Sequence, residues 1–220
     1  MHITDVDSRA ERQPPRARVR RNDRWLVPAV VTGGMVPGAV LVARAAAGML
    51  GANPIAEALN QLGLLALVLL IASLAATPLK IVTGWIWPIK IRKTLGLLAF
   101  SYACAHLATY AGLDQLLDLR AMARDVTERL FIAVGMTAFV VLVPLAVTST
   151  AGMSKRLGAA RWKRLHRLAY LAASLGVVHF VWRVKKDLRE PLVYGAILVV
   201  LFTVRVVHWL RNGGRAPNRR

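Results

Sequence analysis

Residues 161–182, RWKRLHRLAYLAASLGVVHFVW, begin as a basic and aromatic segment and continue as an apolar stretch. The segment contains His166 and His179, and a third histidine, His106, lies in a second apolar stretch, LAFSYACAHLATY at 98–110. Ionisable side chains inside a lipid bilayer are costly and by default mark a functional site. These three histidines are therefore the first candidates for a functional role in a chain that spans a membrane.

The apolar residues occur in runs that are too long for a soluble core. Hydrophobic residues make up 56% of the 220 residues and charged residues 19%, and a helix needs about 20 apolar residues to cross a bilayer. The pattern predicts an all-α, polytopic membrane protein, a bundle of six transmembrane helices. The predicted spans are 26–43, 58–79, 96–113, 130–148, 168–182 and 192–210. Gly34 and Gly38 form a GxxxG pair, which predicts that another helix approaches the first span closely.

The formal net charge of +19 would suggest nucleic acid as the partner of a soluble protein. Here, however, nearly all Lys and Arg lie in loops and tails, where they contact anionic lipid headgroups and set the topology. We therefore expect the basic residues to contact a lipid surface, and we expect no nucleic-acid partner. The loops on the side of the two termini are the more basic, which predicts that both termini are cytoplasmic. Segment 114–129 is polar and predicts a short amphipathic helix or loop.

The predicted organisation is a disordered basic tail at 1–24, a six-helix domain at 25–211 and a basic tail at 212–220. Arg20 and Arg21 precede an apolar run, which leaves a twin-arginine signal open. Polar residues follow the pair directly, which favours a signal anchor that stays in the protein.

The only cysteine, Cys104, lies inside an apolar stretch. A single cysteine can form no internal disulfide and cannot hold an iron–sulfur cluster. The sequence also contains no CxxCH motif, the attachment site of covalently bound haem. Any haem on this chain is therefore predicted to be of the non-covalent b type.

His106 and His179 are predicted to lie at the same depth in the membrane. His106 follows Lys93 by 13 residues and His179 follows Arg167 by 12, and the two spans run in the same direction. Two imidazoles that face each other at one depth can bind a haem iron from both sides. Small residues lie one and two turns from the histidines, where a flat macrocycle would need room: Ala99, Ala103, Ala172 and Gly176.

The third histidine, His166, lies about 20 Å nearer the cytoplasm than His179. Arg164 beside it is a candidate to neutralise haem propionates, but the facing position on span 3 carries Arg92 or Lys93 and no histidine. One haem is therefore predicted, and a second, with His166 as a ligand and Arg92 nearby, is left open.

Tyr102 and Tyr110 flank His106 at i−4 and i+4 and are candidates to bond a propionate or to support the ligand. For each of the three histidines, a plain hydrogen bond to a neighbouring helix is the alternative to metal ligation.

Several segments resemble one bacterial family. They are TPLKIVTGW at 77–85, IRKTLGLLAFSYACAHLATY at 91–110, Thr148-Ser149, LGAARWKRLHRLAYLAASLGVVHFVWRVK at 157–185 and EPLVYG at 190–195. The chain resembles the MsrQ family, formerly YedZ, the haem-binding membrane subunits of the periplasmic methionine sulfoxide reductase system. That family belongs to the ferric-reductase-like transmembrane group.

The resemblance implies a six-helix fold in the bacterial inner membrane that binds b-type haem, with FMN also attributed to the family. It implies that electrons pass from the quinone pool to a periplasmic molybdenum-containing subunit, which reduces methionine sulfoxide in oxidised proteins. Oxidases of the wider group have four haem histidines, and this chain lacks the inner one on span 3. It also lacks a GxGxxG nucleotide motif, so the electron donor is expected to be a separate molecule.

No nucleophile, paired carboxylate or metal-activated water site is visible in the sequence. We therefore predict an electron-transfer subunit of an oxidoreductase complex with no substrate chemistry of its own. Two alternatives stay open: a stand-alone transmembrane ferric or quinone reductase, and a small transporter or assembly factor with structural histidines.

Overall fold

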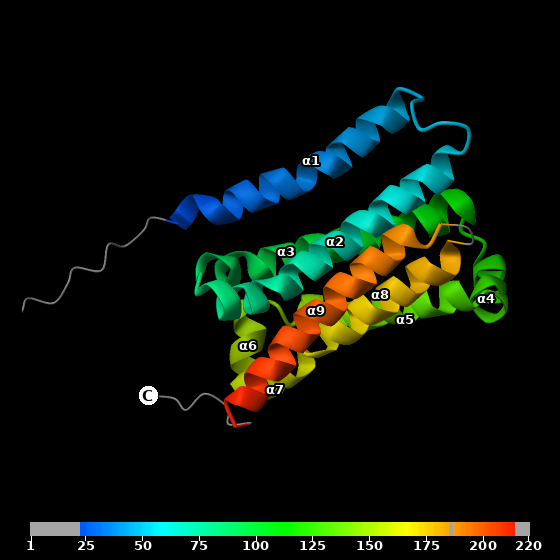
Figure 1. The fold of residues 1–220 in the computed structure, drawn as a ribbon. Coiled ribbons are helices and arrows are strands. Elements are labelled where there is room, and N and C mark those ends of the chain that lie inside the picture. The colour runs from blue at the N-terminus through cyan, green and yellow to red at the C-terminus, as the bar shows by residue number, and fades with distance from the viewer. Residues whose placement is uncertain (1–22, 185–186, 214–220) are drawn as a thin grey trace, which may run out of the picture.

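The computed structural model describes residues 23–184 and 187–213, and this part of the chain is helical with no strand (Figure 1). The predicted tail at 1–24 lies outside the described residues except for its last two, as do the Arg20–Arg21 pair and most of the tail at 212–220. The helices are α1 (Leu26–Ala46), α2 (Pro54–Thr83), α3 (Trp87–Thr109), α4 (Leu119–Glu128), α5 (Leu130–Val147), α6 (Ala151–Leu157), α7 (Ala159–Leu165), α8 (Leu168–Arg183) and α9 (Arg189–Arg211). A 3₁₀ turn, Asp23–Trp25, precedes α1, and a π-helical turn, Tyr110–Asp114, follows α3.

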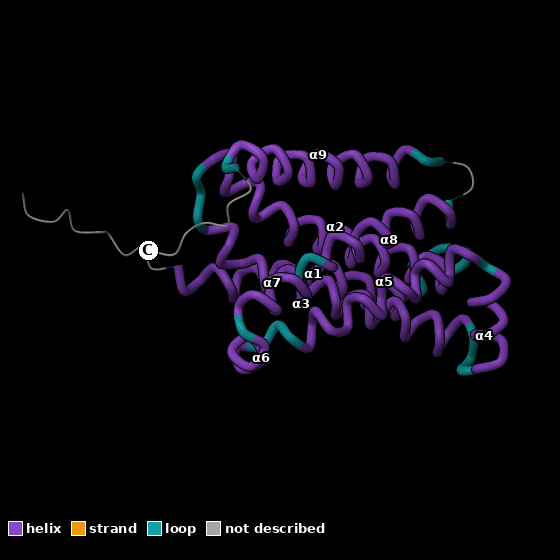
Figure 2. Tube along the Cα trace, turned by 90° about the horizontal axis from the view of Figure 1, so that it is seen from below, coloured by secondary structure: helices purple, strands orange, loops and turns teal. Residues whose placement is uncertain are grey.

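In the described part of the chain, five helices are long and apolar enough to cross a membrane: α1, α2, α5, the α7–α8 segment and α9. The prediction of an all-α, multi-pass membrane bundle is confirmed. The remaining predicted span, 96–113, corresponds to α3, which lies beside α2 (Figures 1 and 2) but is less apolar than the other five. Its first two turns carry Lys90, Arg92 and Lys93, so the helix begins nine residues before the predicted span.

Local sequence signals explain where several helices begin and end. The Asn53 side chain accepts a hydrogen bond from the Ala56 N–H ahead of Pro54, and α2 ends at Gly84 with φ 74°. The Asp118 carboxylate accepts hydrogen bonds from two backbone N–H groups at the start of α4. α4 fulfils the prediction of a short amphipathic helix within 114–129.

Small residues allow the helices to pack closely at the centre of the bundle. Ala172 and Ala173 of α8 are fully buried together with Leu74 of α2 and Ala99 of α3. α9 packs on α2 and α8 at one edge of the bundle (Figure 2). Many large apolar side chains point outward instead, for example Val82 and Val199, as expected of surfaces that face lipid tails.

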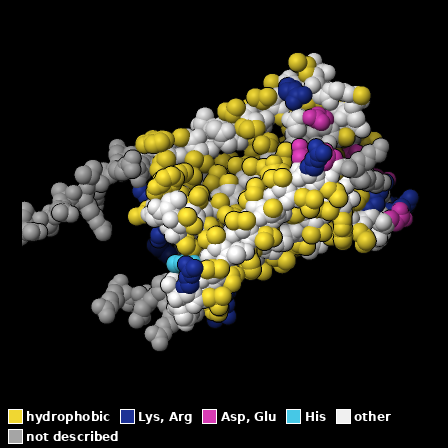
Figure 3. Space-filling model, in the orientation of Figure 1, with side chains coloured by type: hydrophobic (Ala, Val, Ile, Leu, Met, Phe, Trp, Pro, Cys, Tyr) yellow, Lys and Arg dark blue, Asp and Glu magenta, His cyan; other side chains and the backbone are white. Residues whose placement is uncertain are grey.

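The two ends of the bundle differ in charge. We call the end that carries α4 the α4 end, and the end that carries α6 and α7 the α7 end (Figure 1). Acidic side chains gather at the α4 end (Figure 3), which holds every described Asp and Glu except Asp23: Glu57, Asp114, Asp118, Asp125, Glu128, Asp187 and Glu190. The α7 end carries basic residues from α3, α6 and α7. The described chain begins and ends on this basic side.

Helix α1 is attached to the bundle by the Tyr102 side chain of α3. The Tyr102 hydroxyl donates to the Gly34 carbonyl at 2.7 Å and accepts from the Gly38 N–H at 3.0 Å, so it joins two α1 backbone groups. A Cβ at Gly34 would lie 2.6 Å from Leu98 Cδ1, and one at Gly38 would lie 2.8 Å from the Tyr102 hydroxyl. The close approach predicted from the GxxxG pair is confirmed.

The Tyr102 contact yields the first testable prediction. Tyr102→Phe should lower the free energy of unfolding by about 1 kcal/mol, because it removes an interhelical hydrogen-bond bridge within the membrane. Unfolding by sodium dodecyl sulfate in mixed micelles, followed by circular dichroism, measures the effect. Tyr194→Phe is the matched control, because the Tyr194 hydroxyl has no hydrogen-bond partner among the described residues. Equal stability of the two variants would contradict the assignment.

Candidate functional site

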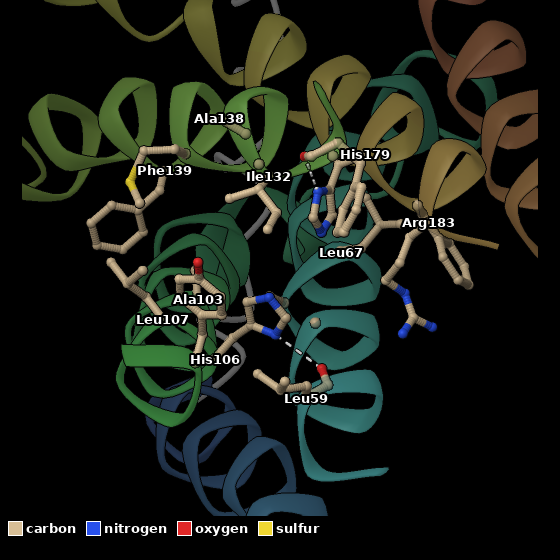
Figure 4. Close-up of a pocket in the computed structure, with 18 of the residues that line it drawn as sticks. Leu59, Leu67, Ala103, His106, Leu107, Ile132, Ala138, Phe139, His179 and Arg183 are labelled. Carbon is tan, nitrogen blue, oxygen red and sulfur yellow. Dashed lines mark hydrogen bonds between the residues drawn. The ribbon is translucent and has the colours of Figure 1, made fainter. Parts of the chain in front are cut away.

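His106 of α3 and His179 of α8 face each other inside the bundle (Figure 4). Their ring centres are 6.3 Å apart and the ring planes are nearly perpendicular, at 87°. Both rings line a cavity of about 340 Å³ enclosed by α2, α3, α5 and α8. The structure thus brings together the two histidines that the sequence placed at one depth. Their role as ligands stays a prediction.

Each imidazole is fixed by a hydrogen bond from Nδ1 to a backbone carbonyl of another helix. The acceptor of His106 is the Leu59 oxygen of α2 at 2.9 Å, and that of His179 is the Phe131 oxygen of α5 at 2.6 Å (Figure 4). Because a carbonyl oxygen only accepts, each Nδ1 must carry the hydrogen. The other nitrogen, Nε2, then keeps a free lone pair and is the atom that binds metals in a neutral imidazole.

Two glycines provide the space in which these rings lie. Gly63 and Gly135 each follow the accepting residue by four positions, on α2 and α5. A Cβ at Gly63 would lie 3.2 Å from two atoms of the His106 ring, and one at Gly135 would lie 2.6 Å from Nδ1 of His179. The two histidines are therefore held in the same way: each ring is hydrogen-bonded to a backbone carbonyl and packs against a glycine one turn further along the same helix.

Two histidine nitrogens suit a metal ion whose other ligands come from a bound cofactor and not from the protein. No group of three or more His, Cys, Asp or Glu side chains that could hold a metal occurs within residues 23–184 and 187–213. A first-row metal ion lies about 2 Å from an imidazole nitrogen, so a ring separation of 6.3 Å leaves room for one ion. His106 and His179 would be the residues that hold the iron of such a macrocycle, and the iron would supply one-electron chemistry.

The walls of the cavity suit a flat apolar molecule. Ala103, Ala172 and Gly176 present little side chain to the cavity, and Leu67 and Phe139 contribute apolar surface. The cavity is of the size that small-molecule sites occupy, about 300–1,000 Å³. Of the small residues singled out in the sequence, Ala99 packs in the core and does not line the cavity, whereas Ala172 does both. The residues present therefore fit a haem of the b type.

His166 lies apart from this pair, at the α7 end, where α7 meets α8. Its Nε2 is 3.1 Å from the Thr148 hydroxyl, and its ring stacks on Trp162 with the ring centres 3.9 Å apart. The Trp162 indole N–H donates to the Thr148 carbonyl at 2.9 Å. His166 is half-buried and does not line the cavity.

The two candidate arginines also lie at the α7 end, outside the cavity lining. Arg92 is partly buried on α3 and donates to the Thr77 hydroxyl at 3.4 Å. Arg164 is exposed on α7. The structure thus separates the predicted residues into a cavity pair, His106 and His179, and a group at the α7 end.

The two candidate tyrosines have different surroundings. The hydroxyl of Tyr102 is used by α1 and does not line the cavity. Tyr110, in the π-helical turn beyond α3, lines the cavity and donates to the Asp125 carboxylate at 3.0 Å. The Tyr110 hydroxyl is thus held by the Asp125 carboxylate at the rim of the cavity.

Several residues of the site were not identified from the sequence. They are the carbonyls of Leu59 and Phe131, the glycines at 63 and 135, and the polar groups Asn60, Arg129 and Arg183 at the rim of the cavity. A lone glycine in an apolar span is common, so Gly63 and Gly135 carried no signal. Arg183 had one, because it follows His179 by four residues and so lies on the same helix face.

This geometry agrees with what the chain is similar to. Residues 61–177, just over half of the chain, match the family model described as "Ferric reductase like transmembrane component". The chain is 49% identical to the "Protein-methionine-sulfoxide reductase heme-binding subunit MsrQ" of Rhodospirillum rubrum, over 86% of this chain and 92% of that protein. It is 47% identical to the protein of the same name from Deinococcus radiodurans, over 90% and 94%. The chain therefore belongs to the ferric-reductase-like transmembrane family and, within it, to the MsrQ family.

The seating of His179 leads to a prediction on haemin binding, with haemin as the probe. Gly135→Ala should weaken binding of haemin to the apoprotein about 10- to 100-fold, because the new methyl group displaces the ring from the Phe131 carbonyl. Gly63→Ala should have a smaller effect, since its contact distance is 3.2 Å instead of 2.6 Å.

Absorption titrations of the purified apoproteins measure both affinities. Gly33→Ala is the control, because a Cβ there would meet nothing within 4 Å. Unchanged haemin affinity in Gly135→Ala would show that haemin binding does not depend on the contact between the His179 ring and Gly135.

Proposed function

We propose that this chain is a membrane electron-transfer subunit that carries b-type haem between His106 and His179. It takes electrons from the quinone pool and passes them to a periplasmic molybdenum-containing subunit, which reduces methionine sulfoxide in oxidised proteins. The names of the relatives support the haem and the methionine sulfoxide system. The chain itself performs no substrate chemistry.

The observation that carries this proposal is the pair of imidazoles, each with Nδ1 bonded to a carbonyl and Nε2 free toward the cavity. A histidine that served only to join two helices would need no partner ring 6.3 Å away. When bound, the haem supplies a carrier of single electrons. The chain fixes the two ligands and their tautomers and surrounds the cavity with apolar walls, which exclude water and help to set the potential.

The charge difference between the ends supports an orientation. The α7 end, where basic side chains dominate and where the described chain starts and ends, is proposed to face the cytoplasm of a bacterium. The α4 end, where acidic and basic side chains nearly balance, is proposed to face the periplasm. Both termini are then cytoplasmic, and the membrane is the inner one. The cavity histidines lie toward the α4 end of their helices, so electrons would leave on the side of the proposed partner.

The group at the α7 end is proposed as the side on which electrons enter. His166, Arg92 and Arg164 lie there. In the structure the Nε2 of His166 is engaged by Thr148, so a second haem at this end would require that bond to open. The FMN attributed to the family is proposed to bind at the α7 end, because this end would be the nearer of the two to a cytoplasmic electron donor.

A spectrum tests the haem assignment. The purified protein should show a reduced-minus-oxidised difference spectrum of the b type, and His106→Ala or His179→Ala should abolish the signal of the cavity haem, because each removes an axial ligand. His208→Ala is the matched control, since this exposed histidine bonds only Asn212 among the described residues. A colourless protein that folds stably would overturn the proposal and favour a transporter or assembly factor.

Reconstitution tests the electron path. Vesicles that contain the chain and a reduced quinol should support reduction of a methionine sulfoxide peptide by the added periplasmic subunit. His106→Ala should lower this rate to the background without the chain. Equal rates with and without the chain would refute the path. Rapid oxidation of the haem by a ferric chelate alone, with no transfer to the added subunit, would instead identify a stand-alone reductase.

A further inference from the structure

Arg183 is a cation at the rim of the cavity that no acidic group of the described residues neutralises. It follows His179 by one helical turn on α8, and its side chain extends away from α8 (Figure 4). Its guanidinium donates to the Asn60 side chain of α2. The residue is only partly exposed. No Asp or Glu of the described part of the chain lies within ion-pair distance of its guanidinium.

The other charged groups at this rim already have partners. Arg129 pairs with the Asp125 carboxylate at 3.2 Å, and Tyr110 donates to the same carboxylate at 3.0 Å. Asp114 accepts from the Gln115 side chain at 2.9 Å. Among the described residues that line the cavity, Arg183 is thus the cation without an acidic partner, and its charge is available to a molecule inside the cavity.

A partly desolvated guanidinium next to an apolar cavity is unfavourable unless an anion accompanies it. Its planar set of donors matches a carboxylate, which it can bind through two hydrogen bonds. A b-type haem is an apolar disc with two propionate carboxylates on one edge. The cavity has the same division, with apolar walls inside and Arg183 and Asn60 at the rim of the α4 end.

We propose that Arg183 binds a propionate of the haem, so that the charged edge of the macrocycle faces the α4 end. This inference rests on the proposed function, since it requires a haem between His106 and His179. It would assign to α8 both a residue that holds the iron, His179, and the counter-charge of the cofactor, Arg183, one turn apart. The haem then has one orientation in the cavity, with its propionate edge nearest the surface at which electrons leave.

Two ligands and one substitution separate this contact from a structural role. The apoprotein and its Arg183→Gln variant are each titrated with haemin and with haemin dimethyl ester, whose propionates carry no charge. Arg189→Gln is the control. Arg189 is exposed at the start of α9, and its replacement removes the same charge from the same end of the bundle. Arg183→Lys, which keeps the charge, is the second variant in case Arg183→Gln does not fold.

In the wild-type protein, haemin should bind about tenfold more tightly than its dimethyl ester, the ratio expected for one charge-assisted hydrogen-bonded pair. Arg183→Gln should weaken haemin binding by a similar factor and leave the affinity for the ester nearly unchanged. Arg183→Lys should lie between the wild type and Arg183→Gln, and Arg189→Gln should match the wild type with both ligands.

A loss of the same size for haemin and its ester in Arg183→Gln would overturn the inference, because it would mean that Arg183 shapes the cavity without touching a propionate. Haemin affinity unchanged in Arg183→Gln would overturn it as well. Wild-type protein that binds neither ligand would overturn the proposed function, and this inference would fall with it.

Discussion

The site depends on one interaction that occurs twice, the hydrogen bond from a histidine Nδ1 to a backbone carbonyl of the adjacent helix. His106 of α3 uses α2 in this way, and His179 of α8 uses α5. Each bond fixes the tautomer, the rotation of the ring and the direction of Nε2. Since lipid tails are as apolar as a helix surface, such polar bonds and close packing hold helices together in a membrane. The same contacts therefore organise the bundle and prepare the ligands.

The sequence predicted the pairing of His106 and His179 because depth follows from simple counting. A helix rises about 1.5 Å per residue, and the basic residues at the α7 end mark where α3 and α8 begin. Counting does not give the rotation of each helix about its own axis. Counting therefore predicts that Tyr102 lies near the cofactor, whereas its hydroxyl is hydrogen-bonded to the backbone of α1 in the structure. For the same reason the sequence did not identify the two carbonyls or their glycines.

The extent of α3 also differs from the prediction for a physical reason. A hydropathy pattern reports where a helix is apolar, not where its backbone bonds begin. Lys90, Arg92 and Lys93 lie on the first turns of α3, and long basic side chains reach from such turns to the membrane surface. The helix therefore continues through nine residues that the apolar pattern excludes. The all-α class was predictable because every other long helix is apolar enough to be recognised.

The bridge from Tyr102 to α1 also fixes how far α1 can slide along the bundle. Apolar side chains of α1 would lose little if the helix moved lengthwise in lipid. A shift by a single residue, however, would carry Gly34 and Gly38 about 1.5 Å past the hydroxyl and bring side chains with a Cβ against α3. The Tyr102 hydroxyl and the two glycines thus set the axial register of α1 relative to α3.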